Sequence, residues 1–181
     1  MRKVVFGGAS SLDNFLARED GAVDWLLWGD EVADIMNAFW PKVDCIVMGR
    51  KTYDVAMRDM PKPKGKKAKN PYGDVKTFVF SRTLTAGNRD GVEITADDPG
   101  EVVRDLKDQE GKDICIMGGG ELARNLFEAG VIDEIGFNIH PVLLGSGIPL
   151  FHGMKCQIDL ELIECRPFKN GCVYLSYAVK N

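Results

Sequence analysis

The chain lacks the features that would place it among nucleic-acid-binding or membrane proteins. Its 181 residues include 23 Lys and Arg against 27 Asp and Glu, so the net charge is −4 and binding to nucleic acid through bulk positive charge is disfavoured. No apolar run approaches the roughly 20 residues that span a bilayer, and the start of the chain has no secretory signal pattern. We therefore expect a cytoplasmic protein with neither a membrane nor a nucleic-acid partner.

Cysteine and histidine are too scattered to form a recognisable metal site. The five cysteines contain no C-x-x-C pair, and the two histidines, His140 and His152, belong to no H-x-E or P-C-x-x-C signature. A zinc deaminase site is therefore excluded, and we expect no bound metal. Cys45 and Cys115 lie in apolar segments, where a thiol usually packs as a small hydrophobic group. The odd number of thiols is typical of a reducing compartment.

Short apolar segments alternate with helical patterns and predict an α/β fold. With 45% apolar and 28% charged residues, the chain has the composition of one globular domain, residues 1–181. Strand-like runs occupy residues 3–6, 44–48, 76–80, 92–95, 113–117 and 134–140. Val32, Ile35, Met36 and Phe39 have helical spacing. This alternation predicts a largely parallel sheet covered by helices.

Two further helices and a terminal hairpin complete the expected fold. Asp98 before Pro99 predicts a capped helix that runs through Leu106, and Gly130 ends a helix that begins at Glu121. Strand patterns at 158–164 and 172–179 flank Lys169-Asn170-Gly171, a hairpin signal. The sheet should therefore be mixed, with antiparallel strands at its C-terminal end. The segment 61–71 carries five lysines, and we expect either a solvated loop or a cationic flap near a phosphate.

Gly118-Gly119-Gly120 is the most informative motif of the chain. It directly follows the apolar run Ile114–Met117 and precedes a helix-like stretch that begins at Glu121. Glycines allow close approach of backbone N–H groups, and a first helical turn offers unpaired donors, so the motif predicts a phosphate site. The alternative is an ordinary turn. A Rossmann domain is rejected, because the motif follows a late strand and no acidic residue ends the next one.

Two other strand ends carry groups that suit phosphate. Gly49-Arg50-Lys51-Thr52 follows the run 44–48, and Ser81-Arg82-Thr83 follows the run 76–80. Guanidinium and hydroxyl groups bind phosphomonoesters well, including the 2′-phosphate of NADP. Ligands of open α/β sheets collect at the carboxyl ends of strands, so the three turns reinforce one another. Helix capping or surface ion pairing is the alternative for each turn alone.

The order and spacing of these motifs resemble the dihydrofolate reductase-like superfamily. The resemblance rests on five segments, namely Ser11-Leu12-Asp13, residues 48–53, residues 80–83, residues 118–122 and residues 141–147. Within the superfamily, the chain is similar to the C-terminal reductase domain of the bifunctional riboflavin-biosynthesis deaminase/reductase. The resemblance implies a three-layer fold with a central, mostly parallel sheet and an antiparallel C-terminal hairpin. The sequence departs from that branch at Asn14, where glycine is usual, and its 181 residues include no match to the deaminase half.

The resemblance implies NADPH across the strand ends. Gly49, Arg50, Lys51 and Thr52 would hold phosphate, and Ser81, Arg82 and Thr83 would face the adenosine 2′-phosphate. Gly118, Gly119, Gly120, Glu121 and Leu122 would face the pyrophosphate and the nicotinamide. We expect Gly119→Val to block this approach without disturbing the core.

The resemblance also implies where the substrate binds. In dihydrofolate reductases a carboxylate on the first helix, a few residues after a tryptophan, contacts the pterin. Asp30 after Trp25 is the nearest match and the candidate catalytic residue, although Asp30 also suits an N-cap. Glu31 and Asp13 are further candidates for substrate binding, and Asp13 could instead shape a turn. Trp25 and Trp28 could stack on a planar heterocycle or simply pack in the core.

The motifs and the resemblance together predict an NADPH-dependent reductase. The resemblance implies that hydride passes to a C=N or C=O bond of a planar heterocycle that is pterin-like or ribosylaminopyrimidine-like, in a reaction related to riboflavin biosynthesis. The alternative is a non-catalytic nucleotide-binding protein that keeps the fold. The resemblance also suggests a homodimer, in which apolar residues of the hairpin 158–179, including Ile163 and Cys165, would lie near the interface.

Overall fold

Eleven strands and four helices alternate along the part of the chain that the structure describes. The structure is a computed structural model, and it describes residues 1–59, 72–89, 91–155 and 157–180. The elements, in order, are β1 (Val4–Ser11), β2 (Phe15–Ala17), α1 (Asp30–Phe39), the 3₁₀ turn η1 (Trp40–Lys42), β3 (Val43–Gly49), α2 (Arg50–Asp59), β4 (Lys76–Phe80), β5 (Gly87–Arg89), β6 (Val92–Thr95), α3 (Pro99–Asp108), β7 (Asp113–Met117), α4 (Gly120–Glu128), β8 (Glu134–His140), β9 (Ile148–Pro149), β10 (Leu160–Pro167) and β11 (Val173–Val179).

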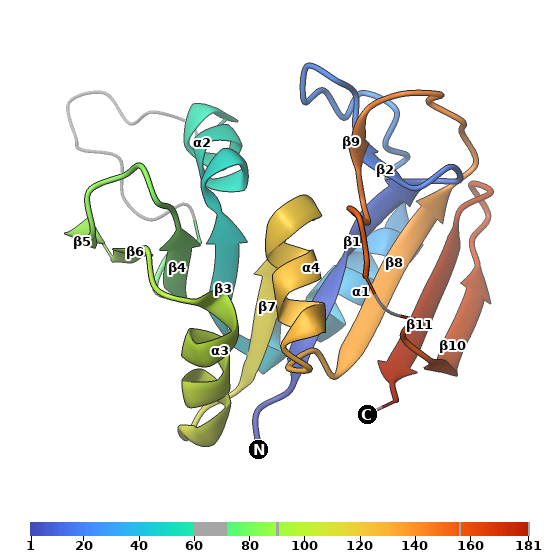
Figure 1. Cartoon of the computed structure of the whole chain (residues 1–181). Helices are drawn as coiled ribbons and strands as arrows, with labels where there is room; N and C mark the ends of the chain where they lie inside the picture. The colour runs from blue at the N-terminus through green and yellow to red at the C-terminus, as the bar shows by residue number, and fades with distance from the viewer. Residues whose placement is uncertain (60–71, 90, 156, 181) are drawn as a thin grey trace.

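The predicted mixed sheet is confirmed, and its strand order explains where the motifs meet. Within the described residues nine strands run in the order β10-β11-β8-β1-β7-β3-β4-β6-β5 (Figure 1). The six strands from β8 to β6 are parallel, and β5, β10 and β11 pair antiparallel. β7 lies between β1 and β3, with Ile114 beside Val4 and Ile116 beside Val47. The late glycine motif therefore emerges between two early strands.

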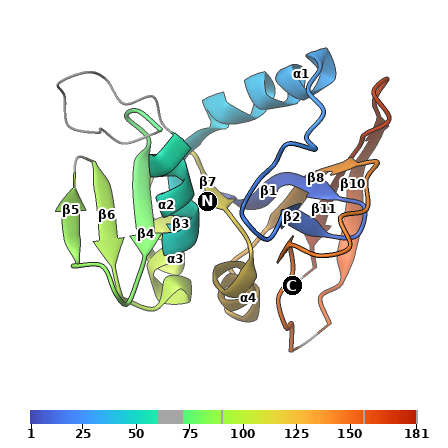
Figure 2. The ribbon, with the colours of Figure 1, turned by 90° about the horizontal axis from the view of Figure 1, so that it is seen from above.

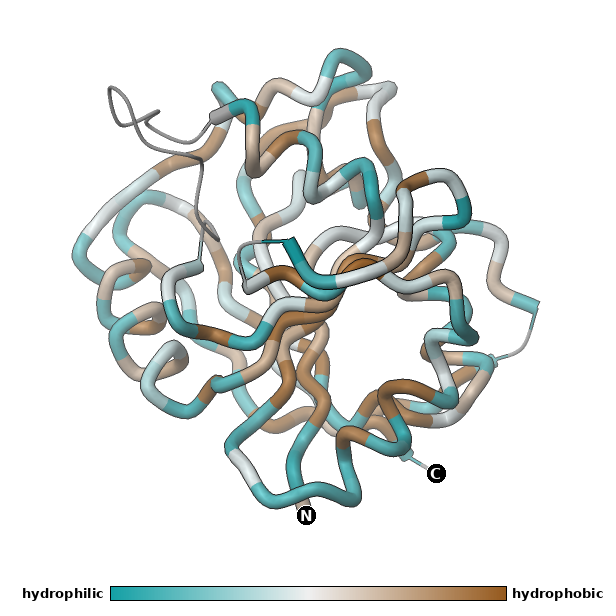
Figure 3. The backbone as a smooth tube through the Cα atoms, turned by 90° about the vertical axis from the view of Figure 1, so that its left-hand side faces the viewer, coloured by the Kyte–Doolittle hydropathy of each residue, from teal (hydrophilic) through white to brown (hydrophobic). Residues whose placement is uncertain are grey.

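Helices cover both faces of the centre of the sheet. Viewed from above, α3 and α4 lie on one side of the sheet and α1 on the other (Figure 2). Leu106 and Leu126 pack against Phe6 and Ile116 on the first side. Phe39 and Trp40 join the cluster of the second side. The most hydrophobic backbone segments accordingly run through the middle of the molecule (Figure 3), as expected for parallel strands buried on both faces.

The ends of two helices test the capping signals. The carboxylate of Asp98 accepts the Glu101 N–H at 3.0 Å, and α3 begins at Pro99, so this prediction is confirmed. Asp30 is not an N-cap, because it is the first residue of α1 and the preceding Gly29, in an extended conformation, takes that place without a side-chain hydrogen bond. The carboxylate of Asp30 therefore does not cap the N-terminus of α1.

The C-terminal hairpin forms as predicted. Its inner strand β11 packs Tyr177 and Val179 against the core, whereas its outer strand β10 lies beyond the core. β10 contains no buried residue, and Leu162 and Ile163 are 56% and 54% exposed. β10 is the last strand of the sheet, and its apolar groups extend beyond the core that the helices build.

Three short elements carry too little pattern to be predicted. β2 and β9 pair in a small second sheet, and β5 adds a three-residue edge to the main one. The lysine-rich segment 61–71 lies outside the described residues. No helix in the described ranges is both long and apolar enough to cross a membrane.

Candidate functional site

The carboxyl edge of the sheet contains an open space at the start of α2. Gly49 ends β3, and Arg50 begins α2. A Cβ atom added to Gly49 would have no heavy atom within 4 Å, nor would one added to Gly120 at the start of α4. Both helix starts therefore face room for a ligand, and the unpaired N–H groups of a first turn suit an anion.

The glycine turn faces α2 through Thr52. Gly118 and Gly120 have φ values of 87° and 65°, which favour glycine. A Cβ atom on Gly118 would lie 2.2 Å from the Thr52 hydroxyl oxygen, so the two predicted phosphate segments are in contact. Glu121 is exposed, whereas Leu122 packs in the core. The structure thus brings these parts of the predicted cofactor site together.

Gly119 has a different environment from the one expected. A Cβ atom there would lie 2.6 Å from Leu16 Cδ1 and 2.8 Å from the carbonyl oxygen of Leu150. The expectation that Gly119→Val leaves the core undisturbed is therefore wrong, because valine would displace β2 and the segment after β9. The sequence gives no signal for these long-range contacts.

The two arginines of the predicted phosphate segments differ in whether they have hydrogen-bond and ion-pair partners. Arg50 donates to the Thr83 hydroxyl at 2.5 Å, and this hydrogen bond joins the start of α2 to the turn after β4. Arg50 also pairs with Asp54, one turn further along α2, at 3.3 Å. Arg82 and Lys51 are exposed, and neither has an ion-pair partner in the described part of the chain. Arg82 is therefore free to meet an anionic ligand.

The Ser81 side chain forms hydrogen bonds within the turn that follows β4. It is 7% exposed, and its hydroxyl oxygen accepts the N–H groups of Thr83 and Leu84 at 3.2 and 3.0 Å. This hydrogen bonding is typical of a serine that closes a turn. Ser81 thus presents Arg82 and Thr83 at the surface, and a direct contact of its hydroxyl with phosphate stays a prediction.

Four of the predicted substrate residues lie on the approach to α1 or in its first turn. Trp25 is 8% exposed and packs edge-to-face on the His140 ring, with ring centroids 5.2 Å apart. Trp28 is 68% exposed. Asp30 is exposed at the start of α1, and Glu31 accepts the Lys169 N–H at 3.3 Å. Hydrogen bonds from its own N–H and from that of Lys169 lower the pKa of Glu31, so this carboxylate is held ionised.

The Asp13 carboxylate forms hydrogen bonds with the end of β1 and with the loop after β8. Its carboxylate accepts the Ser11 hydroxyl at 2.6 Å and the N–H groups of Leu144 and Gly145 at 3.1 and 2.8 Å. These bonds, chiefly that from Ser11, lower the pKa of Asp13. The residue ties the end of β1 to the loop after β8, and a role in substrate binding stays a prediction.

His140 is the centre of a buried polar cluster that sequence reasoning did not find. The ring is 2% exposed, and its Nδ1 accepts the Leu27 N–H at 3.1 Å. Cys172 Sγ lies 3.4 Å from Nδ1, and the Asn138 amide lies 3.2 Å from Nε2. The position of His140 at the end of an apolar strand was visible in the sequence, but except for Asn138 on the same strand its partners come from two distant segments, the approach to α1 and the residue before β11.

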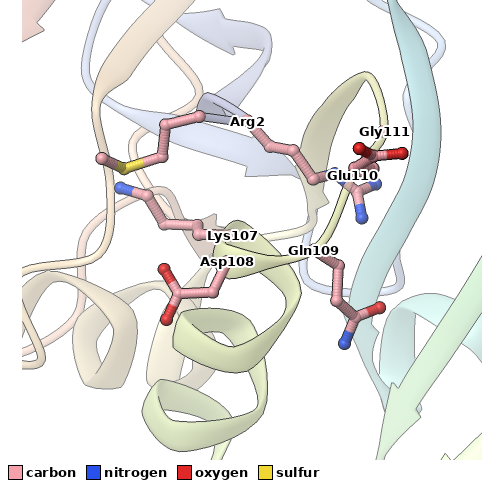
Figure 4. A pocket seen from close by; sticks show the side chains of 7 residues that line it. Arg2, Lys107, Asp108, Gln109, Glu110 and Gly111 are labelled. Carbon is pink, nitrogen blue, oxygen red and sulfur yellow. The ribbon is translucent and has the colours of Figure 1, made fainter.

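A polar pocket of about 480 Å³ lies at the opposite end of the strands, beside the N-terminus and the end of α3 (Figure 4). Arg2, which lines it, donates to the carbonyl oxygens of Lys112 at 2.6 Å and Leu106 at 3.3 Å and pairs with Asp44. The guanidinium therefore holds three segments together, which is a structural role. The described ranges contain no cluster of His, Cys, Asp and Glu that could hold a metal ion.

Comparisons with known proteins agree with this arrangement. The model of the RibD C-terminal domain matches residues 2–174. The uncharacterized protein YyaP of Bacillus subtilis is 32% identical over 180 residues, which cover 97% of this chain and 94% of that protein. The crystal structure of a putative riboflavin biosynthesis protein from Shewanella sp. PV-4 superposes with a TM-score of 0.81 at 27% identity, over 100% of both chains.

The likeness in fold extends to dihydrofolate reductase. The enzyme from Enterococcus faecalis, complexed with NADP(H) and RAB-propyl, superposes with a TM-score of 0.65 at 16% identity, over 99% of this chain and 97% of that one. The predicted dihydrofolate reductase-like fold is therefore confirmed. With a family model that covers nearly all of the sequence and a relative of similar length, the chain belongs to the RibD C-terminal domain family.

Proposed function

We propose that the protein is an NADPH-dependent reductase that transfers hydride to a C=N or C=O bond of a planar heterocycle. The single observation that carries the proposal is the open, anion-suited space at the starts of α2 and α4, with the unpaired Arg82 on the same edge of the sheet. Membership of the RibD C-terminal domain family supports reductase chemistry and a substrate related to riboflavin biosynthesis.

The residues at this edge fit a dinucleotide phosphate. The pyrophosphate would lie against the helix starts at Gly49–Thr52 and Gly118–Leu122, where a Cβ atom on Gly49 or Gly120 would enter empty space. Arg82 would hold the 2′-phosphate, and Thr83 would remain linked to Arg50. The cofactor would supply the hydride, and the protein would supply orientation and exclude competing water.

The substrate would lie beside the cofactor, toward β1 and β8. Trp28 is available for stacking, whereas Trp25 is buried and forms part of the wall. Asp30 is the candidate proton donor because it is exposed at the start of α1 and does not cap the helix. Glu31 is held ionised and would instead accept hydrogen bonds from ring nitrogens.

Nucleotide titrations of wild type and two variants test the proposal. We expect wild type to bind NADPH more tightly than NADH, and Arg82→Ala to lose about 10- to 100-fold for NADPH alone, since a charge-assisted hydrogen bond contributes about 1.5–3 kcal/mol. Arg89→Ala is the matched control, because it removes an exposed arginine from β5 toward the other end of the strands. Equal affinities of wild type for the two nucleotides would overturn the assignment of Arg82.

Cofactor consumption separates an enzyme from a protein that only binds nucleotide. The non-catalytic alternative is favoured by one observation: Glu31 and Asp13 both have lowered pKa values and are poor proton donors. NADPH absorbance should fall when pterins or ribosylaminopyrimidine phosphates are added, and Asp30→Asn should slow this reaction. Tight NADPH binding without consumption by either class would support the alternative.

The exposed apolar edge at β10 supports a symmetric homodimer. Leu160, Leu162 and Ile163 leave apolar surface on an unpaired edge strand, which favours association with a second copy. Light scattering at micromolar concentration should give twice the chain mass of 20.0 kDa. Leu162→Asp should dissociate the dimer, whereas Leu143→Asp, at a site 69% exposed outside the hairpin, should not. A wild-type mass of one chain would contradict the proposal.

A further inference from the structure

Helix α1 is held to the sheet more weakly than the helices on the other face. α3 and α4 each insert buried side chains, such as Leu106 and Leu126, whereas no residue of α1 is buried and Met36 is 40% exposed. The last turn is fixed because Phe39 and Trp40 join the core. The position of the first turn therefore depends on specific contacts rather than on packing.

Three contacts hold the approach to α1 and its first turn, and two of them involve one residue. The Leu27 N–H donates to His140 Nδ1 at 3.1 Å, and Trp25 packs on the edge of the same ring. The third contact is the hydrogen bond from Lys169 to Glu31. Because Leu27 lies three residues before Asp30, the ring of His140 determines where the first turn begins.

The hydrogen bonds determine the state of the ring. A nitrogen that accepts an N–H carries a lone pair, so Nδ1 is unprotonated and the neutral ring bears its proton on Nε2. Nε2 then donates to the Asn138 amide oxygen. In the structure the amide nitrogen faces Nε2, and Oδ1 is buried with no partner among the described residues. A half-turn of the amide, which exchanges two atoms of similar size, would turn Oδ1 toward Nε2 and give the Nε2 proton its acceptor.

We propose that His140 is a positioning residue that, as a neutral acceptor, fixes the start of α1 and with it Asp30 and Glu31 at the substrate site. The inference rests on the proposed function for the role of these carboxylates. The contacts of His140 with Leu27 and Trp25, which we call the His140 clamp, belong to the protein without ligands. The clamp can therefore be measured without substrate or cofactor.

The groups that contact the ring are uncharged. Asn138 comes from β8, Cys172 is the residue before β11, and Trp25 and the Leu27 N–H come from the approach to α1. Burial therefore lowers the pKa of His140, and burial also raises the pKa of the Cys172 thiol, which stays neutral. Because the folded-state pKa of His140 lies below the unfolded value, the clamp is complete above about pH 6.5. It is lost as the pH falls through the folded-state pKa.

Two substitutions separate the acceptor from the bulk of the side chain. In His140→Asn the amide oxygen can reach the place of Nδ1 and accept the Leu27 N–H, whereas the longer side chain of His140→Gln places its polar group near Nε2. Amide hydrogen exchange of residues 25–39 should rise roughly tenfold or more in His140→Gln, as expected when a partly buried N–H loses its acceptor. It should stay near the wild-type rate in His140→Asn. Equal exchange in the two variants would overturn the proposal.

Nitrogen-15 NMR of the wild-type rings gives a second test that needs no variant. The chain has two histidines, and His152 is exposed. His140 should show the Nε2–H tautomer at neutral pH and stay neutral below about pH 6.5, the ordinary pKa of a histidine. Protonation of Nδ1 at neutral pH, or a charged His140 ring at about pH 6.5, would overturn the proposal even if His140→Gln fails to fold.

Kinetics then connect the clamp to the site. With a substrate found by NADPH consumption, His140→Gln should raise KM while the Kd for NADPH stays unchanged, and His140→Asn should restore KM. An unchanged KM in His140→Gln would overturn the positioning role. If no substrate is consumed at all, the proposed function fails, whereas exchange and NMR still decide whether the clamp exists.

Discussion

Gly49→Ala is the most direct test of the nucleotide site, because the structure separates its effect on binding from its effect on stability. The new methyl group would meet no heavy atom within 4 Å, and Gly49 has a backbone conformation that alanine can adopt. The free energy of unfolding should therefore stay constant within about 0.5 kcal/mol, or rise by about 0.4–1 kcal/mol because the unfolded chain loses freedom.

Binding should respond much more strongly. The methyl group would occupy the space in which a phosphate approaches the first turn of α2, and the loss of one hydrogen bond to a charged group costs about 1.5–3 kcal/mol. The Kd for NADPH, measured by isothermal titration calorimetry, should thus rise roughly 10- to 150-fold. Thermal unfolding of the same sample without nucleotide is the control. If Gly49→Ala binds NADPH within twofold of wild type, the nucleotide does not lie against α2 and the reasoning is refuted.

Two further substitutions test the packing and the capping described above. Gly119→Val should destabilise the protein by about 1–3 kcal/mol, because its side chain would overlap Leu16 and Leu150; unchanged thermal unfolding would show that these contacts can relax. Asp98→Ala should lower the free energy of unfolding in urea by about 1 kcal/mol through loss of the α3 cap. Asp105→Ala, on the exposed side of α3, should have a smaller effect, and equal losses would argue against capping.

Features encoded by neighbouring residues could be predicted from the sequence. The apolar runs locate the central strands, Asp98 before Pro99 locates the start of α3, and Asn170-Gly171 locates the terminal hairpin. The segments predicted to bind phosphate are local as well, because each follows its strand directly. Their meeting at one edge follows from the parallel arrangement that alternating strands and helices predict.

Features that depend on distant segments could not be predicted. The partners of Asp13 are backbone groups of the loop after β8, and the neighbours of Gly119 come from β2 and the segment after β9. β2 and β9 are too short to show a period. The apolar pattern of β10 indicates a strand, but it does not say whether another part of the same chain covers it.

The insertion of β7 between β1 and β3 imposes an order of assembly on the edge of the sheet at which we propose that nucleotide binds. β1 and β3 leave the ribosome early, but neither can pair with its central neighbour until residues 113–117 have been made. Such sequence-distant pairing is slow, and the start of α4 forms only with it. Bound nucleotide would thus connect the first and second halves of the chain. It should protect both halves from proteolysis together, since local opening of either half would release the ligand.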